Sequence, residues 1–161
     1  MVRKFACLLA IVAAPAVAEN NIVEEIGDWE VRTAVDPMSD ATTYTVEAQG
    51  ANGEIAYYCS PDRRVTLVVL SNNFLGSGPR DQEVQFRVDD RPSRTEAWRY
   101  GRDLVGAPEK QFSNEIADGK SVLVRVRSFN HSSYDITVPI DGARAAITRF
   151  YELCGKKNPL K

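Results

Sequence analysis

The chain has 161 residues, of which 43% are hydrophobic, 26% charged and 9% aromatic. This balance excludes a wholly disordered, collagen-like or coiled-coil polypeptide, and the length is typical of one domain with a closed hydrophobic core. The formal net charge of −2 disfavours nucleic acid as a general partner. We therefore expect a soluble globular domain that binds no nucleic acid.

The amino terminus has the three zones of a secretory signal peptide. Two basic residues precede an apolar run over residues 5–14, and small residues follow up to Ala18. The apolar run is about half of the roughly 20 residues that cross a bilayer, which favours a cleaved leader over an uncleaved membrane anchor. The sequence predicts a signal peptide over residues 1–18 and a single β-rich domain over 19–161. We expect this domain in the periplasm of a Gram-negative bacterium or secreted from it, without an integral membrane anchor after cleavage.

Export brings two cysteines into an oxidising compartment. Cys7 lies in the leader, so the mature chain keeps only Cys59 and Cys154, which allow a single pairing. A bridge between them closes a loop of about 96 residues, for which the chain-entropy model gives roughly 4.7 kcal/mol. Two buried thiols are the alternative, and the absence of a Cys-x-x-Cys pair disfavours a redox-active role. We predict a structural disulfide between Cys59 and Cys154.

Alternation of apolar and polar residues predicts strands through the first half of the mature chain. The first strand starts at Trp29, and a second, around residues 44–48, follows a proline-containing turn. A hairpin loop then leads to a strand over residues 55–59, which aims Cys59 at the core. The nearly continuous apolar run over residues 65–70 is rich in β-branched side chains and predicts a central strand covered on both faces.

The second half mixes strands with two helices. Residues 71–81 contain two glycines and a proline and predict an exposed loop. The remaining pattern predicts strands at 84–88 and 95–100 joined by a turn, a short helix at 109–118, strands at 122–127 and 136–140, and a terminal helix at 142–154. The last helix carries Cys154 on its apolar stripe. We expect an all-β fold with minor α content, either an antiparallel two-sheet β-sandwich or a partly open barrel, with a short helix and a C-terminal helix.

Residues with catalytic potential are few. His131 is the only histidine, which excludes a His-rich metal site, and no nucleophile motif accompanies its polar turn. Asp89–Asp90 and Glu24–Glu25 can supply two carboxylates for sugar hydrolysis, but sequence neighbours in a strand point to opposite faces. We predict no catalytic residue, no metal and no cofactor. A carboxylate-dependent cell-wall hydrolase remains an alternative.

Arginines of the middle third are interleaved with two aromatic residues. Forked hydrogen bonds from Arg91 and Arg94, together with stacking on Trp98 and Tyr100, can bind an anion or a polysaccharide. Acidic neighbours such as Asp89 offset the arginines, so a mixed solvated face is the competing interpretation. We take these five residues as the candidate binding surface and a carbohydrate- or anion-binding module as an alternative function.

The function that we predict is non-catalytic recognition. Loops on a rigid sheet scaffold are where binding contacts usually lie, and the exposed segments over residues 71–81 and 89–100 are the candidates. The expected partner is another envelope or secreted protein, which makes the chain an accessory or protein-binding domain of the cell envelope or of a secretion process.

Several short motifs, in order, resemble a small exported family. Between residues 27 and 155 they are Gly27-Asp28-Trp29-Glu30-Val31, Pro37-Met38-Ser39-Asp40, Cys59, Arg87-Val88-Asp89 followed by Trp98, Leu123-Val124-Arg125, and Ile140-Asp141-Gly142-Ala143 before the helix with Cys154. Together they resemble the VasI-type accessory proteins associated with type VI secretion and, more distantly, the invasion-associated locus B proteins. The resemblance implies a periplasmic, non-enzymatic accessory or binding domain and supplies no catalytic residues.

Overall fold

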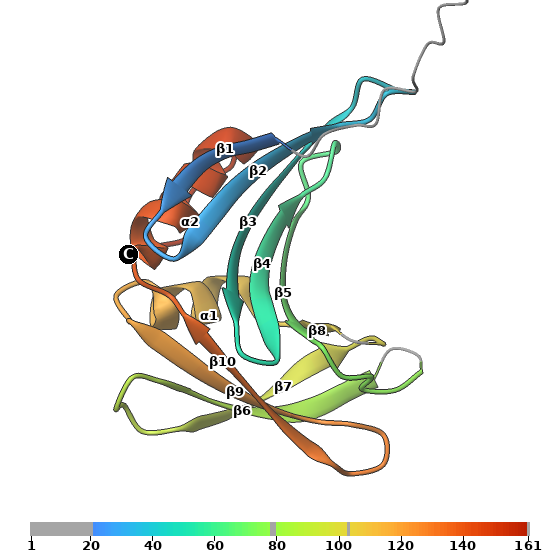
Figure 1. Cartoon of the computed structure of the whole chain (residues 1–161), viewed down its shortest axis with the longest axis vertical. Helices are drawn as coiled ribbons and strands as arrows, with labels where there is room; N and C mark the ends of the chain where they lie inside the picture. Colours follow the sequence, from blue (N-terminus) through green and yellow to red (C-terminus); the bar gives the residue numbers. More distant parts are fainter. Residues whose placement is uncertain (1–20, 78–79, 103, 161) are drawn as a thin grey trace, which may run out of the picture.

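The computed structural model describes residues 21–77, 80–102 and 104–160, so the leader lies outside the described residues. Within this part the chain forms ten strands and two helices (Figure 1). In chain order they are β1 (Asn21–Ile26), β2 (Trp29–Val35), β3 (Thr42–Gly50), β4 (Gly53–Cys59), β5 (Val65–Ser71), β6 (Arg80–Val88), β7 (Arg94–Tyr100), β8 (Leu104–Gly106), α1 (Glu109–Ile116), β9 (Ser121–Arg127), β10 (Ser133–Pro139) and α2 (Ala143–Cys154).

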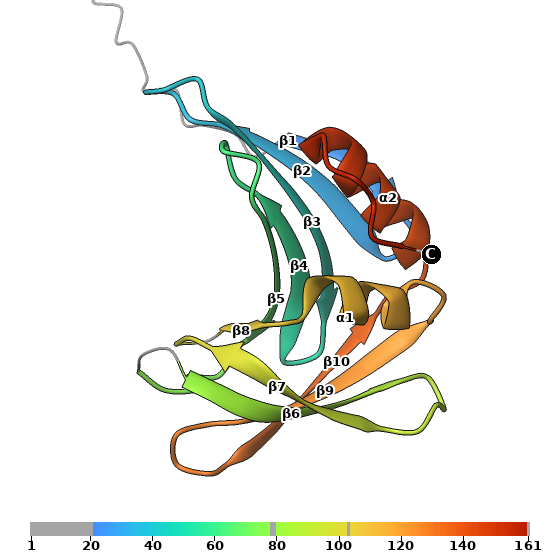
Figure 2. The ribbon, with the colours of Figure 1, turned by 180° about the vertical axis from the view of Figure 1, so that it is seen from behind.

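All ten strands belong to one open antiparallel sheet, with the order β1-β2-β3-β4-β5-β8-β7-β6-β9-β10. The first five strands form a meander, and the other five continue the same sheet beyond β5. Figures 1 and 2 show the second half of the sheet turning across the lower end of the first. The predicted β-rich class and both predicted helices are confirmed.

The two-sheet sandwich predicted from the sequence is wrong, because β8 joins the two halves. Its three residues pair with Val68–Leu70 of β5 on one side and with Arg99 and Tyr100 of β7 on the other. So short a strand carries no alternation that a sequence pattern can reveal. Hydrogen bonding therefore continues from β5 through β8 to β7, and the strands form one sheet where two were expected.

The sheet also bends back on itself at its other end. Ala51, in the β3–β4 turn, exchanges two backbone hydrogen bonds with Thr137 of β10, at 2.8 and 3.1 Å. A Cβ at Gly50 would lie 2.1 Å from the Thr137 carbonyl oxygen, so this approach requires glycine. The partly open barrel is therefore nearer to the observed fold than the sandwich, although β1 and β10 remain the two edges of the sheet.

The sequence pattern did not indicate β1 either. This strand pairs with β2, and its register shifts between Ile22 and Glu24. A bulge of this kind breaks the two-residue period on which strand prediction depends. At the opposite edge, Pro139 ends β10, the position expected for a residue without an amide hydrogen.

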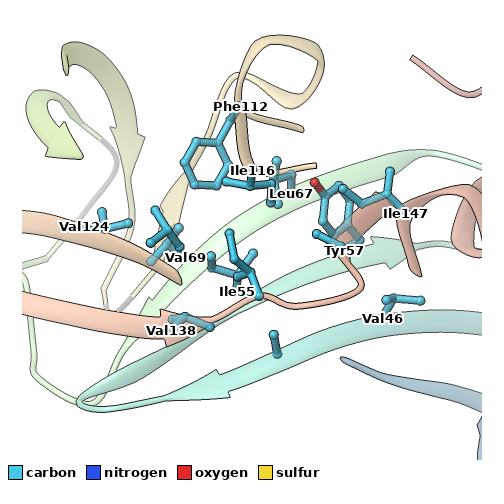
Figure 3. Packing of buried hydrophobic residues seen from close by; sticks show 14 of the residues in the cluster. Val46, Ile55, Tyr57, Leu67, Val69, Phe112, Ile116, Val124, Val138 and Ile147 are labelled. Atoms are coloured by element: carbon cyan, nitrogen blue, oxygen red, sulfur yellow. The ribbon is translucent and has the colours of Figure 1, made fainter. Parts of the chain in front are cut away.

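The core lies between the curved sheet and the two helices. Figure 3 shows Phe112 of α1 and Ile147 of α2 in the same buried cluster as Tyr57 and Val69 of the sheet. The ring centroid of Phe112 lies 5.3 Å from that of Phe86, in an edge-to-face contact. Both helices thus cover the inner face of the sheet.

A disulfide and buried hydroxyl groups connect the helices to β4 and to each other. Cys59 ends β4 and Cys154 ends α2, with the two Cα atoms 5.8 Å apart, which confirms the predicted bridge. The Tyr57 hydroxyl is hydrogen-bonded to Ser113 Oγ of α1 at 2.8 Å, and the Tyr151 hydroxyl of α2 donates to the Glu109 carboxylate. Burial raises the pKa of both tyrosines well above the usual range, so both hydroxyls stay protonated and able to donate.

Candidate functional site

The aromatic members of the predicted binding surface lie inside the protein. Trp98 and Tyr100 each keep only 1% of their surface exposed. Trp98 packs against Phe86 and Phe112, with centroid distances of 5.6 and 4.9 Å. The Tyr100 hydroxyl accepts a hydrogen bond from the backbone N–H of Arg127 at 3.1 Å. Neither ring is therefore available at the surface for stacking on a sugar.

Asp89 holds the turn after β6 against the start of β9. One carboxylate oxygen, Oδ1, accepts hydrogen bonds from the backbone N–H groups of Lys120 and Ser121, at 3.0 and 2.9 Å. These bonds, chiefly the one from Ser121, hold the pKa of the Asp89 carboxyl below its usual value of 3.8. The residue also adopts a positive φ of 49°, which aspartate tolerates better than most side chains. Its geometry is that of a turn-stabilising residue.

We expect Asp89→Ala to lower the free energy of unfolding by about 1–2 kcal/mol at pH 7, because two backbone donors lose their acceptor. The folded-state pKa of Asp89 is lowered, so its ionised form stabilises the fold above pH 3.8 and this contribution is lost as the pH falls. Urea unfolding of both proteins at pH 7 and pH 3 measures the effect. The difference between them should shrink at pH 3, and a constant difference would contradict this role of the carboxylate.

Arg91 and Arg94 do lie together, around one residue of α1, Glu115. Arg94 Nη1 forms an ion pair with Glu115 at 2.6 Å, and Arg91 Nη1 donates to the Glu115 carbonyl oxygen at 3.0 Å. With Arg87 they line a hollow of about 230 Å³ between the β6–β7 turn and α1. Of the five predicted surface residues, therefore, only these two line this hollow, and Glu115 neutralises part of their charge.

A second surface feature was not expected from the sequence. The side chains of Phe74 and Phe129 are 50% and 58% exposed, and their rings meet edge to face with centroids 5.8 Å apart. Phe74 lies in the loop after β5 and Phe129 in the turn between β9 and β10. Figure 1 shows both loops at the lower right of the molecule, on the side away from α2. We call this pair, with residues 71–77 and 128–132 that carry it, the aromatic end.

Backbone hydrogen bonds fix the two loops of the aromatic end to each other. The Phe129 N–H donates to the Leu75 carbonyl at 2.8 Å, and the Leu75 N–H donates to the Arg102 carbonyl at 2.7 Å. The Leu75 side chain is fully buried, and Arg80 Nη2 donates to the same Leu75 carbonyl at 2.7 Å. The two phenylalanine rings are thus exposed on a backbone that is already held in place.

Only half of this feature was accessible from sequence. The predicted exposed loop over residues 71–81 includes Phe74, and a phenylalanine that follows two asparagines in a glycine-containing loop is a signal for an exposed ring. Phe129 likewise lies between Ser128 and Asn130. Nothing in a single sequence indicates that these residues, from separate turns, touch each other.

Comparison with known proteins supports the fold. No family model matches the chain, and no curated protein sequence matches it. The crystal structure of invasion associated protein B from Bartonella henselae is similar, with a TM-score of 0.56 and 14% sequence identity. The match covers 83% of this chain and 98% of that one. At this identity the likeness shows a shared fold only, and it agrees with the more distant of the two family resemblances. The VasI-type resemblance has no support from these comparisons.

The disulfide suggests an oxidising location outside the cytoplasm. Among residues 21–77, 80–102 and 104–160, none of the helices has the length and apolar character needed to span a membrane.

Proposed function

We propose that this chain is a non-catalytic domain of the periplasm or the secreted fraction that binds another envelope or secreted protein through its aromatic end. The observation that carries the proposal is the exposed Phe74–Phe129 pair. Large aromatic rings side by side at the surface of a soluble domain commonly mark an interaction site. The fold shared with invasion associated protein B and the disulfide are consistent with a role in the envelope.

The backbone hydrogen bonds that hold the two loops of the aromatic end favour tight binding of a partner protein. Binding costs conformational entropy when loops must become ordered, and the hydrogen bonds through Leu75 remove part of that cost beforehand. An aromatic ring has few rotatable bonds, so it buries a large area on contact with a partner at low entropic cost. Truncation of either phenylalanine should therefore weaken binding strongly, as at an interaction hot spot.

Site-specific crosslinking in the native host tests the proposal. A photoreactive benzoylphenylalanine at position 129 should form an adduct with an envelope or secreted protein, which mass spectrometry identifies. The same group at position 38 is the control, because Met38 is 93% exposed in a different loop. The purified partner should then bind the wild-type protein at least about tenfold more tightly than the Phe74→Ser/Phe129→Ser variant.

Two results would contradict the proposal. One is an equal set of adducts from positions 129 and 38, which indicates random collision. The other is a purified partner that binds wild type and the double serine variant with the same affinity. Circular dichroism of the variant checks its fold, which these exposed side chains should not affect.

The hollow beside Arg87 favours a second candidate function, the binding of a small anion. Arg87 is exposed, and among the described residues its guanidinium has no hydrogen bond or ion pair. Arg91 and Arg94 are held in fixed positions by Glu115. A titration with inorganic phosphate or sulfate, followed by NMR at the arginine Nε–Hε groups, should shift these signals first. Unchanged signals at millimolar anion would dismiss this function.

A further inference from the structure

We infer that the partner segment bound at the aromatic end is acidic: a stretch of polypeptide in which apolar side chains are accompanied by Asp or Glu. This inference rests on the proposed function and adds the chemistry of what is bound. It comes from the charges that surround the Phe74–Phe129 pair. The phenylalanines supply the apolar contact, and guanidinium groups next to them select carboxylates.

Two exposed arginines lie close to the pair along the backbone. Arg102 and Arg127 are exposed, and within the described residues neither guanidinium takes part in a hydrogen bond or an ion pair. The backbone of each arginine is close to that of one of the two phenylalanines. The Arg102 carbonyl accepts hydrogen bonds from Leu75 and Gly76, the residues that follow Phe74, and Arg127 precedes Phe129 by two positions. Within the described part of the chain, no acidic side chain competes with a bound chain for these two charges.

A third arginine has a supporting role. Arg80 donates to the Leu75 carbonyl at 2.7 Å, and its guanidinium carbon lies 5.8 Å from the centre of the Tyr100 ring. These contacts hold the loop that carries Phe74 and keep a further positive charge close to the surface. The side chain is only partly exposed, so we assign it positioning of the loop and a contribution to the local potential.

The described residues of the same surface include no acidic side chain. No Asp or Glu occurs in residues 71–77, 100–102 or 127–134. Of the nearest acidic residues, Asp81 pairs with Arg99 at 3.4 Å, and Asp135 makes two hydrogen bonds with Arg125 at 2.6 and 2.7 Å. Asp103 lies outside the described residues. A chain with a formal charge of −2 thus has, among its described residues, two arginines without an ion pair close to its exposed aromatic pair.

The composition of the aromatic end favours a polypeptide over a lipid surface. Proteins that bind anionic membranes by charge usually present clusters of about four to eight Lys or Arg residues. Here there are two free guanidiniums and no lysine, and the loops carry asparagine and serine, which suit the hydrogen-bonding groups of a peptide backbone. Guanidinium groups also pair with carboxylates through two parallel hydrogen bonds, which adds selectivity.

Peptide binding at varied salt concentration tests the inference. The probe is a fluorescein-labelled peptide of alternating Leu and Glu, and its match is a peptide of alternating Leu and Gln. Fluorescence anisotropy should show that the wild-type protein binds the acidic peptide and that its Kd rises about tenfold between roughly 50 and 200 mM NaCl. The neutral peptide should bind at least about tenfold more weakly than the acidic one at low salt.

Matched charge reversals locate the effect. Arg102→Glu/Arg127→Glu should weaken acidic-peptide binding by at least about tenfold. Lys156→Glu/Lys157→Glu changes the net charge equally but lies just beyond α2, on the other side of the molecule (Figures 1 and 2), and should leave the Kd within about twofold. An equal loss in both variants would show an effect of net charge alone and would overturn the inference.

Other outcomes separate this inference from the proposed function. One outcome is a captured partner that requires Phe74 and Phe129 for binding while its affinity does not change with salt or with the arginine reversals. This result agrees with the proposed function and contradicts the inference that the bound segment is acidic. Equal affinity for the two peptides, or no binding of the acidic peptide, overturns it as well. If the protein binds vesicles that contain phosphatidylglycerol but does not bind the acidic peptide, the ligand of the aromatic end is a membrane surface and the inference of an acidic polypeptide is overturned.

Discussion

Loss of the Cys59–Cys154 disulfide is expected to lower the free energy of unfolding by about 4–5 kcal/mol and the Tm by roughly 10–15 °C. The two cysteines are 95 positions apart, so the bridge closes a loop that contains most of the folded chain. In the chain-entropy model, a long loop is what makes the effect large, because the unfolded state loses the most freedom.

The position of the bridge adds to its effect. It joins the end of β4 to the last residue of α2, a helix end that is otherwise held by the packing of Phe150 and Tyr151 in the core. Arg63 Nη1 donates to the Leu153 carbonyl at 3.1 Å, but the bond is exposed to solvent. Without the disulfide, fraying of α2 should therefore begin at its carboxyl end and expose Phe150 and Tyr151, which the helix packs against the core.

Thermal unfolding of three samples measures the effect: oxidised wild type, wild type with dithiothreitol, and Cys59→Ala/Cys154→Ala. The second and third should unfold at similar temperatures, well below the first. The double variant should be insensitive to dithiothreitol, which controls for effects of the reagent and of Cys7. A Tm change of less than about 3 °C on reduction would contradict the structural role of the bridge.

Local sequence patterns predicted the individual strands and helices of this fold better than the way in which the strands join into one sheet. The alternation around Cys59 and the apolar stripe that ends at Cys154 were enough to place the disulfide between a strand and the last helix. The joining of the sheet depends on contacts without a local signal, namely the three residues of β8 and the approach of Thr137 to the β3–β4 turn. Such contacts are set by packing of the whole domain.

The predicted binding surface shows the same limit. Alternation along β7 puts Arg94, Trp98 and Tyr100 on one face, and the structure agrees. The pattern does not say whether that face is covered. Helix α1 lies over it, so Phe112 packs on Trp98 and Glu115 meets Arg94. Helix α1 thus buries Trp98 in the core and pairs Arg94 with a carboxylate, so this face of β7 cannot stack on a glycan.

Trp98→Ala should therefore act on stability, with an expected loss of about 3–5 kcal/mol in the free energy of unfolding. Trp98 is 1% exposed and contacts Phe86 and Phe112, so its removal leaves a cavity at the junction of β6, β7 and α1. Trp98→Phe keeps an aromatic ring in contact with both neighbours and should cost less than the alanine variant.

Urea unfolding at pH 7 measures these losses, with Arg91→Ala as the surface control. That side chain is exposed and makes one hydrogen bond to a carbonyl, so its removal should cost no more than about 1 kcal/mol. Acrylamide should quench the fluorescence of Trp98 poorly in the Trp29→Phe background, since the indole is shielded from solvent. Ready quenching, together with a small loss of stability in Trp98→Ala, would place the ring at the surface and restore it as a candidate for sugar stacking.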